Sequence, residues 1–404
     1  MKVLLLENIS GVAVSQFEEA GFAVEALKGA LNERELIEKV CGVSILGVRS
    51  KTRITAAVLD AARELVSVGA FCIGVDKIDR AASSERGIAV FNDPHSNSRS
   101  VAELAMGEII LLMRRTFESS TQLHGGVWNK SSAGSHEVRG LTLGIVGYGK
   151  IGSQVSDLAE ALGMRVVFHD VAHVLARGNA RPVSFRELLT TSDVITLHVD
   201  GKVQNQDLFG EEELRMMKDG ACLINLSRGF VVDHEALAQH LKSGRLAGAA
   251  VDVFPQEPES GGSFASPLRG LPNVILTPHI GGSTEEAQQN IGQFVSARMI
   301  DYFRSGNSQL SVNMPLCHLD FDPNSEPRSY RLTHMHHNVP GILRAINDIL
   351  ADRGINIERQ VLDTRGALGY AIYDINRSCD EALLAKLRAV PQTIRVRVPG
   401  GARG

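Results

Sequence analysis

Three glycines, Gly147, Gly149 and Gly152, lie in the segment LTLGIVGYGKIGSQ between a short apolar run and a stretch with helical spacing. A second apolar run, residues 165–169, follows the helical stretch and ends at Asp170. In a strand–helix–strand unit, the first glycine permits a tight turn and the second lets a pyrophosphate approach the backbone. The third allows the helix to pack closely on the strand. The pattern therefore predicts a parallel sheet that binds a dinucleotide at a helix N-terminus.

The acidic residue Asp170 predicts which dinucleotide is bound. Its carboxylate can accept hydrogen bonds from both hydroxyls of the adenosine ribose, and its charge would repel a 2′-phosphate. The sequence therefore predicts NAD as the cofactor. A purely structural role for the three glycines, as sites of close packing, is the alternative.

Three residues have side chains suited to catalysis: Arg228, Glu257 and His279. Each follows a short apolar run in the same half of the chain. The carboxyl ends of parallel strands meet at one edge of a sheet, where ligands bind. Arg228 can bind a carboxylate with two hydrogen bonds, and His279 can transfer a proton near neutral pH. Glu257 can orient that imidazole and stabilise its protonated form. The set predicts redox chemistry on a hydroxy or keto acid. Asp252, at the end of the apolar run that precedes Glu257, is expected at the nicotinamide end of the cofactor.

Each of these residues taken alone has an ordinary structural interpretation. An arginine after a strand can be a surface charge, a glutamate between two prolines can belong to a turn, and a histidine after Pro278 can cap a strand. The functional interpretation depends on all three occurring together behind the dinucleotide motif.

Alternating strand and helix patterns predict an α/β protein with two doubly wound parallel sheets and a C-terminal βαββαβ domain of ferredoxin-like type. Two long helical patterns, beginning at Ser100 and Ser283, each open with an expected capping box, Ser100 with Glu103 and Ser283 with Glu286. They separate a central domain from a discontinuous one. The expected boundaries are 1–98 with 283–316 for the substrate-binding domain, 99–282 for the NAD-binding domain, 317–328 for a linker and 329–404 for the last domain.

Composition excludes several classes of function. The formal net charge of -4 gives no overall basic field for nucleic acid. No uninterrupted apolar run of about 18 residues predicts a membrane span. The start, MKVLLLENIS, is typical of a first strand rather than a signal peptide. Five dispersed cysteines without a CxxC motif favour free thiols and a cytoplasmic protein.

The segments LGIVGYGKIGSQ, INLSRGFVVD, AGAAVDVFPQEP and LTPHIGGSTEEAQ resemble the D-isomer-specific 2-hydroxyacid dehydrogenases. Further stretches, such as GAFCIGVDKID and RLTHMHHNVPGIL, resemble the short members that oxidise a phosphorylated substrate and carry one C-terminal regulatory ACT domain. The resemblance covers nearly the whole chain. It implies that Arg228, Glu257 and His279 are catalytic, with His279 as the proton donor. It also implies an NAD site lined by Gly147, Gly149, Lys150, Ile151, Gly152, Asp170, Leu226, Ser227, Asp252, Gly281 and Gly282.

The resemblance also implies a substrate. This is 3-phosphoglycerate, oxidised to 3-phosphohydroxypyruvate in the first step of L-serine biosynthesis. Arg49 and Ser50 match the family's phosphate-binding segment, and Lys51 stands where a close relative would have arginine, which keeps the charge but loses the two-pronged hydrogen bonding. A solvated turn is the alternative for this cluster.

For the C-terminal domain, the resemblance implies feedback inhibition by L-serine. His336, Asn338 and Asn356 match the positions that hold this effector between paired ACT domains, and a homotetramer is implied. His334 and His336 share a strand face and suggest a metal chelate as an alternative, but no third ligand is evident, so no metal is predicted.

Two other functions are compatible with the residues. One is a glyoxylate, hydroxypyruvate or 2-oxoglutarate reductase of the same family, which the cationic residues Arg49 and Lys51 disfavour. The other is an NAD-sensing interaction protein without catalysis, which the complete set of Arg228, Glu257 and His279 disfavours.

Overall fold

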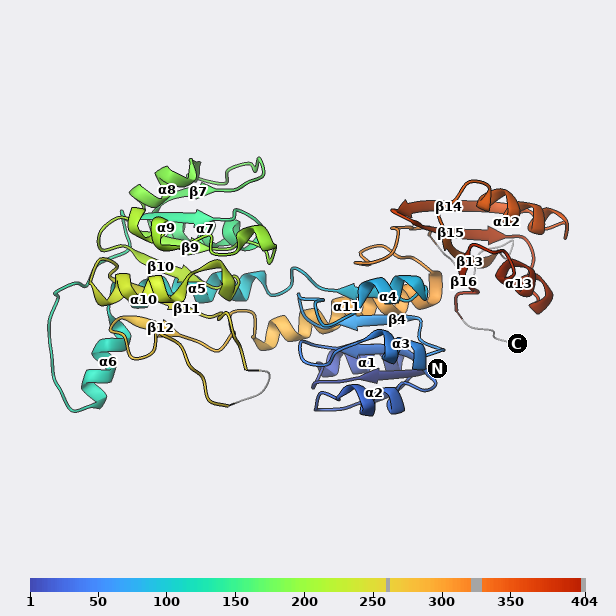
Figure 1. Ribbon diagram of the computed structural model, residues 1–404, viewed down its shortest axis with the longest axis horizontal. Helices are drawn as coiled ribbons and strands as arrows, with labels where there is room; N and C mark the ends of the chain where they lie inside the picture. Colours follow the sequence, from blue (N-terminus) through green and yellow to red (C-terminus); the bar gives the residue numbers. More distant parts are fainter. Residues whose placement is uncertain (259–261, 321–328, 401–404) are drawn as a thin grey trace. The chain divides into compact units, whose positions relative to one another are not determined.

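The structure, a computed structural model, describes residues 1–258, 262–320 and 329–400 and divides into two compact units. The first unit contains Met1–Pro94 and Gln288–Gly404, and the second contains His95–Ala287. Figure 1 shows the three sheets around which the helices of these units are arranged. Most of the predicted linker, residues 321–328, lies outside the described residues, as do residues 401–404.

The first unit begins with a parallel five-stranded sheet in the order β2-β1-β3-β4-β5. Apolar runs form its central strands because both faces are covered, and every residue of β3, β4 and β5 is buried. The strands are β1 (Lys2–Leu5), β2 (Ala23–Ala26), β3 (Val43–Val48), β4 (Ser67–Ala70) and β5 (Ala89–Asn92). The connecting helices are α1 (Gly11–Glu19), α2 (Glu33–Lys39), α3 (Ala56–Ala61) and α4 (Arg80–Glu85).

The C-terminal part of the same unit is an antiparallel sheet in the order β14-β15-β13-β16. Helices α12 and α13 cover one face, where their apolar residues pack on the strands (Figure 1). The elements are β13 (Tyr330–His337), α12 (Ile342–Ala351), β14 (Ile357–Arg365), β15 (Leu368–Ile375), α13 (Glu381–Arg388) and β16 (Thr393–Arg397).

The second unit contains a seven-stranded parallel sheet in the order β12-β11-β10-β9-β6-β7-β8. The order reverses between β6 and β9, which is where an open α/β sheet binds its ligand. The strands are β6 (Thr142–Val146), β7 (Arg165–His169), β8 (Arg181–Pro182), β9 (Val194–Leu197), β10 (Cys222–Asn225), β11 (Gly248–Val251) and β12 (Val274–Leu276). The helices are α5 (Ser98–Met113), α6 (Thr116–His124), α7 (Lys150–Ala161), α8 (Phe185–Thr191), α9 (Glu211–Met216) and α10 (His234–Lys242), with short 3-10 turns η1 (Val203–Asn205) and η2 (Gly229–Val231).

The predicted fold class is confirmed, but both predicted capping boxes are wrong. Helix α5 begins at residue 98, so Ser100 lies inside it and bonds the Thr284 hydroxyl at 2.9 Å. Glu103 pairs with Arg99 instead. Helix α11 (Glu285–Ser305) begins after Thr284, whose hydroxyl accepts from the Ala287 N–H at 3.2 Å. The Ser-x-x-Glu pattern failed because serine and glutamate are common throughout first turns, and the preceding turn decides where a helix starts.

Candidate active site

A single carboxylate fixes the loop that carries His279. Asp252 follows β11, and its side chain accepts hydrogen bonds from the Thr277 hydroxyl at 2.6 Å and from the N–H groups of Ile280 and Gly281 at 2.8 Å each. The His279 N–H donates to the Asp252 carbonyl at 2.8 Å. His279 has φ 55, a left-handed conformation that is uncommon for a residue with a Cβ. Asp252 is 1% exposed, so its carboxylate is committed to this loop.

Glu257 and His279 form a hydrogen-bonded pair. The His279 Nδ1 donates to Glu257 Oε2 at 2.8 Å, and the Phe254 N–H donates to Glu257 Oε1 at 3.0 Å. The bond to Glu257 raises the pKa of His279, against the opposing effect of burial. Burial of Glu257 favours its neutral form, but the bonds from His279 and Phe254 outweigh burial and lower the pKa of this carboxyl. The pair therefore stabilises an imidazolium and leaves Nε2 of His279 for proton transfer.

Arg228 lies at the carboxyl end of β10, in a turn that Asn225 organises. The Asn225 amide donates to the Arg228 carbonyl at 3.1 Å and accepts from the Ser227 N–H at 3.0 Å. The Arg228 Nη1 donates to the Ser227 carbonyl at 2.7 Å. The charge of Arg228 opposes the rise in the pKa of His279. Arg228 and His279 therefore both follow strands of one sheet, at its C-terminal edge.

The glycine motif forms a cradle that fits a dinucleotide. Gly147 has φ 90, and a Cβ there would lie 2.6 Å from the His198 carbonyl oxygen, so only glycine suits this turn. A Cβ on Gly152 would lie 2.2 Å from the Gly147 carbonyl oxygen, which shows how closely α7 approaches the strand. Nothing lies within 4 Å of a Cβ on Gly149. No side chain caps α7, whose first residues are Lys150 and Ile151. Its free N–H groups suit a pyrophosphate.

Asp170 stands at the end of β7 beside the cradle. Its carboxylate accepts from the Tyr148 N–H at 2.7 Å and from the Ala172 N–H at 2.8 Å. Each oxygen keeps a lone pair for a ribose hydroxyl, because a carboxylate offers about four acceptor sites. Other residues expected around NAD line the neighbouring strand ends: Leu226 and Ser227 are buried after β10, Gly281 is buried beside Asp252, and Gly282 lies against Asn97.

The residues expected to bind phosphate lie in the first unit. Arg49, Ser50 and Lys51 follow β3 directly, at the point where the order of the first sheet reverses between β1 and β3. The Ser50 and Lys51 side chains are exposed and Arg49 is partly exposed. The position is the ligand-binding edge of such a sheet.

The expected effector residues are not gathered within one copy of the chain. His336 is 1% exposed, beneath the helices of the ACT sheet, with its Nδ1 3.2 Å from Nδ1 of His334. Asn338 follows β13 and is exposed beside the β14–β15 turn. Asn356 is exposed at the opposite end, where it pairs with Asn376. The β13–β15 and β14–β15 registers place Asn356 roughly 30 Å from Asn338, at about 3.3 Å per residue.

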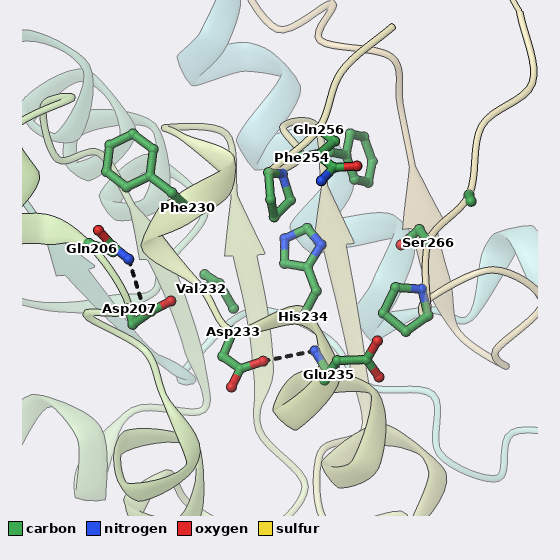
Figure 2. A pocket seen from close by; sticks show the side chains of 13 residues that line it. Gln206, Asp207, Phe230, Val232, Asp233, His234, Glu235, Phe254, Gln256 and Ser266 are labelled. Atoms are coloured by element: carbon green, nitrogen blue, oxygen red, sulfur yellow. Dashed lines mark hydrogen bonds between the residues drawn. The ribbon is translucent and has the colours of Figure 1, made fainter.

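A cavity of about 460 Å³ lies beside the catalytic loops of the second unit, and Figure 2 shows His234 at its centre. Its lining includes Phe230, two residues after Arg228, and Gln256, one residue before Glu257. Arg228, Glu257 and His279 are not among the lining residues.

Within the described ranges, no three His, Cys, Asp or Glu side chains are grouped as metal ligands would be. The parts of the chain that the structure describes include no helix with the length and hydropathy needed to cross a membrane.

Comparisons with known proteins agree with this fold and site. Residues 106–281 match the sequence model of the "D-isomer specific 2-hydroxyacid dehydrogenase, NAD binding domain", and residues 332–395 match an "AHAS small subunit-like ACT domain". The chain belongs to the D-isomer-specific 2-hydroxyacid dehydrogenase family and is an NAD-dependent oxidoreductase.

Relatives within the family carry a more particular name. A D-3-phosphoglycerate dehydrogenase of Dictyostelium discoideum is 47% identical to this chain, covering 98% of it and 97% of the relative. The enzyme of the same name from Escherichia coli K12 is 46% identical, with 98% and 97% covered. A D-lactate dehydrogenase of Aquifex aeolicus, solved with NAD and lactic acid, is 27% identical. Its TM-score is 0.63, and the match covers 74% of this chain and 95% of that one.

Sequence reasoning missed the residues that support the loops of Arg228 and His279. Thr277 and Asn225 hold the loops of His279 and Arg228, and Gly229 lets the Phe254 backbone approach, since a Cβ there would lie 2.0 Å from the Phe254 carbonyl carbon. A signal for Asn225 existed, because an amide at the end of a buried strand requires partners.

Proposed function

We propose that this chain oxidises 3-phosphoglycerate to 3-phosphohydroxypyruvate with NAD, with feedback inhibition by L-serine. The structural observation that carries the proposal is the 2.8 Å bond between His279 and Glu257, beside Arg228 and on the sheet that forms the dinucleotide cradle. The substrate follows from relatives named D-3-phosphoglycerate dehydrogenase that match nearly the whole chain.

The proposed mechanism assigns one role to each catalytic group. Arg228 binds the substrate carboxylate. His279 accepts the proton of the C2 hydroxyl at Nε2 while the C2 hydrogen leaves with its electron pair. Glu257 accepts the Nδ1–H bond and stabilises the imidazolium that forms. NAD, when bound, supplies the acceptor for the hydride. In the reverse reaction the protonated His279 returns the proton to the keto oxygen.

The phosphate of the substrate is assigned to Arg49, Ser50 and Lys51. A guanidinium can bind phosphate with two hydrogen bonds, whereas the ammonium of Lys51 supplies a point charge. Recognition by these residues would distinguish a phosphorylated substrate from glyoxylate or 2-oxoglutarate.

The proposed effector site needs a second copy of the chain. Asn338 and Asn356 lie at opposite ends of one ACT sheet, so a serine molecule held by both amides has to contact two copies. His336 would contribute only if its ring turned from its buried position. We assign a homotetramer, with a further contact through α6 and the segment that follows it, where Phe117, Leu123, Val127 and Trp128 are exposed, Trp128 by 81%. All five cysteines are free thiols, which supports a cytoplasmic location.

The first experiment measures NADH oxidation by the full chain with 3-phosphohydroxypyruvate, titrated with L-serine. Turnover that falls as serine rises supports both the catalytic and the regulatory proposal. Turnover that does not change as serine rises would refute L-serine as the effector and would leave the proposed substrate standing. Turnover only with glyoxylate or 2-oxoglutarate would overturn the phosphorylated substrate, and NADH binding without any turnover would favour a sensor.

A variant pair tests the role of His279. His279→Asn should lower kcat by at least about a hundredfold, as expected when a general acid–base is removed. The matched control is His318→Asn, because His318 is also an exposed imidazole paired with a carboxylate, Asp320, at 3.1 Å. Equal kcat in the two variants would refute the assignment.

A further inference from the structure

Two loops meet where the order of the first sheet reverses. Strands β1 and β3 are hydrogen-bonded neighbours. The chain runs from β1 to β2 on one side of this pair and from β3 to β4 on the other side. The residues after β1 and after β3 therefore share the edge at which a sheet of this topology binds ligands. Glu7 follows β1, and the segment 49–53 follows β3.

The backbone after β1 has an uncommon conformation. Glu7 and Asn8 have φ values of 64 and 54, although neither is glycine. The Glu7 N–H donates to the Gly29 carbonyl at 3.1 Å, and the Asn8 N–H donates to the Leu27 carbonyl at 3.1 Å. Two successive left-handed residues with side chains persist only when the surroundings determine them, and such positions cluster at functional sites.

The Glu7 carboxylate is buried, with 7% of the residue exposed, and it binds the backbone of the second loop. Its Oε2 accepts from the Lys51 N–H at 3.0 Å, and its Oε1 accepts from the Thr52 N–H at 2.8 Å. The Arg49 Nη1 donates to the Glu7 carbonyl oxygen at 3.5 Å, the limit of a hydrogen bond. Both carboxylate oxygens and the main chain of Glu7 are thus directed to one loop.

We propose that Glu7 is a positioning residue that holds the loop 49–53 in the shape that binds the substrate's phosphate. The inference rests on the proposed assignment of Arg49, Ser50 and Lys51 to that phosphate. No contact with the substrate is assigned to Glu7 itself.

The arrangement explains how an acid can serve an anion-binding loop. Both Glu7 oxygens are engaged by N–H groups beneath the loop, and its charge offsets part of the repulsion among Arg49, Lys51 and Arg53. The N–H groups of Lys51 and Thr52 are occupied by Glu7, so the phosphate is contacted by side chains. The cationic groups are then held in place before the substrate arrives, which lowers the cost of binding.

The test is steady-state kinetics of the full-length Glu7→Gln variant. The side chain keeps its shape, but its NH2 group faces one of the two N–H donors, so one bond becomes a contact between donors. We expect KM for 3-phosphohydroxypyruvate to rise about tenfold, equivalent to about 1.4 kcal/mol, while KM for NADH and kcat change less than about twofold. The matched control is Glu25→Gln, which removes a carboxylate of the same unit that pairs with Lys2 and Lys39.

Two further variants separate the possible failures. If Arg49→Ala leaves KM for the phosphorylated substrate unchanged, the proposed phosphate site itself is wrong. If Arg49→Ala raises KM but Glu7→Gln does not, the phosphate site stands and the role of Glu7 is overturned. In the Glu7→Gln/Arg49→Ala double variant the two effects should be less than additive, because both act on one loop, and full additivity would contradict the proposal.

A conservative variant covers the case in which Glu7→Gln does not fold. Glu7→Asp keeps the charge but is one methylene too short to reach both N–H groups. It should raise KM for the phosphorylated substrate by less than Arg49→Ala does, with kcat retained. Wild-type KM in Glu7→Asp would refute the need for both bonds.

Discussion

Replacing Glu257 by glutamine should move the pH dependence of the reaction. Oxidation requires the neutral imidazole of His279, so kcat/KM for oxidation rises with pH through the pKa of His279. The bond to Glu257 raises the pKa of that imidazole. Glu257→Gln removes the charge and keeps an acceptor at nearly the same place. The rising limb of the oxidation profile should therefore move to lower pH. The reduction reaction needs the protonated imidazole, so its activity should begin to fall at a lower pH than in the wild type.

The size of the shift follows from the geometry of the pair. A hydrogen bond to a charged group contributes about 1.5–3 kcal/mol, whereas exposed ion pairs contribute about 0.2–1 kcal/mol. The side chains of His279 and Glu257 are 50% and 37% exposed, so solvent screens the 2.8 Å interaction in part. An intermediate value of about 1.4 kcal/mol corresponds to roughly one pH unit.

The assay is kcat/KM for oxidation between about pH 5.5 and 9 at constant ionic strength. Glu235→Gln is the matched control, because Glu235 is an exposed carboxylate of the same unit for which no bond to His279 is found. A rising limb at the same pH in wild type and Glu257→Gln would refute the assigned coupling. A shift of the limb to higher pH would show that Glu257 lowers the pKa of His279 instead of raising it.

Three further changes have expected outcomes. Gly229→Ala places a Cβ 2.0 Å from the Phe254 carbonyl carbon. It should lower kcat by about a hundredfold, because a displacement of about 1 Å near catalytic groups has that cost. Asp170→Asn should raise KM for NAD and allow measurable turnover with NADP, since the charge that repels a 2′-phosphate is lost. Arg331→Met should lower the free energy of unfolding by about 1.5–3 kcal/mol, measured in urea, because Asp374, 0% exposed, loses a buried partner at 2.7 Å and keeps Arg359 at 2.6 Å.

Two of these predictions have control variants, and the prediction for Asp170→Asn has an outcome that would contradict it. Gly11→Ala should leave kcat unchanged, because nothing lies within 4 Å of a Cβ at Gly11. Arg344→Met removes an exposed pair with Asp348 and should change stability by less than about 0.5 kcal/mol. Equal stability of Arg331→Met and Arg344→Met would contradict the buried-pair argument. Unchanged discrimination against NADP in Asp170→Asn would show that another group excludes the 2′-phosphate.

Local patterns were sufficient for the secondary structure and the cofactor motif. The apolar runs and helical spacing around Gly147 predicted β6, α7 and β7, and β7 spans the predicted residues 165–169, because burial on both faces selects apolar strands. The βαββαβ order of the last domain was predicted from its alternating strand and helix patterns. Helix starts were less predictable, as the failed capping boxes at Ser100 and Ser283 show.

The amino-acid sequence by itself determined the fold class, the dinucleotide motif and the identity of Arg228, Glu257 and His279 as a possible set, because these depend on spacing along the chain. Only the tertiary structure decided which groups hold them. Asp252 and Thr277 are 25 residues apart, and Glu7 and Thr52 are 45 residues apart, yet each pair is joined by a hydrogen bond. Strand order brings such residues together, and strand order is set by packing and twist across the whole sheet rather than by any local run of residues.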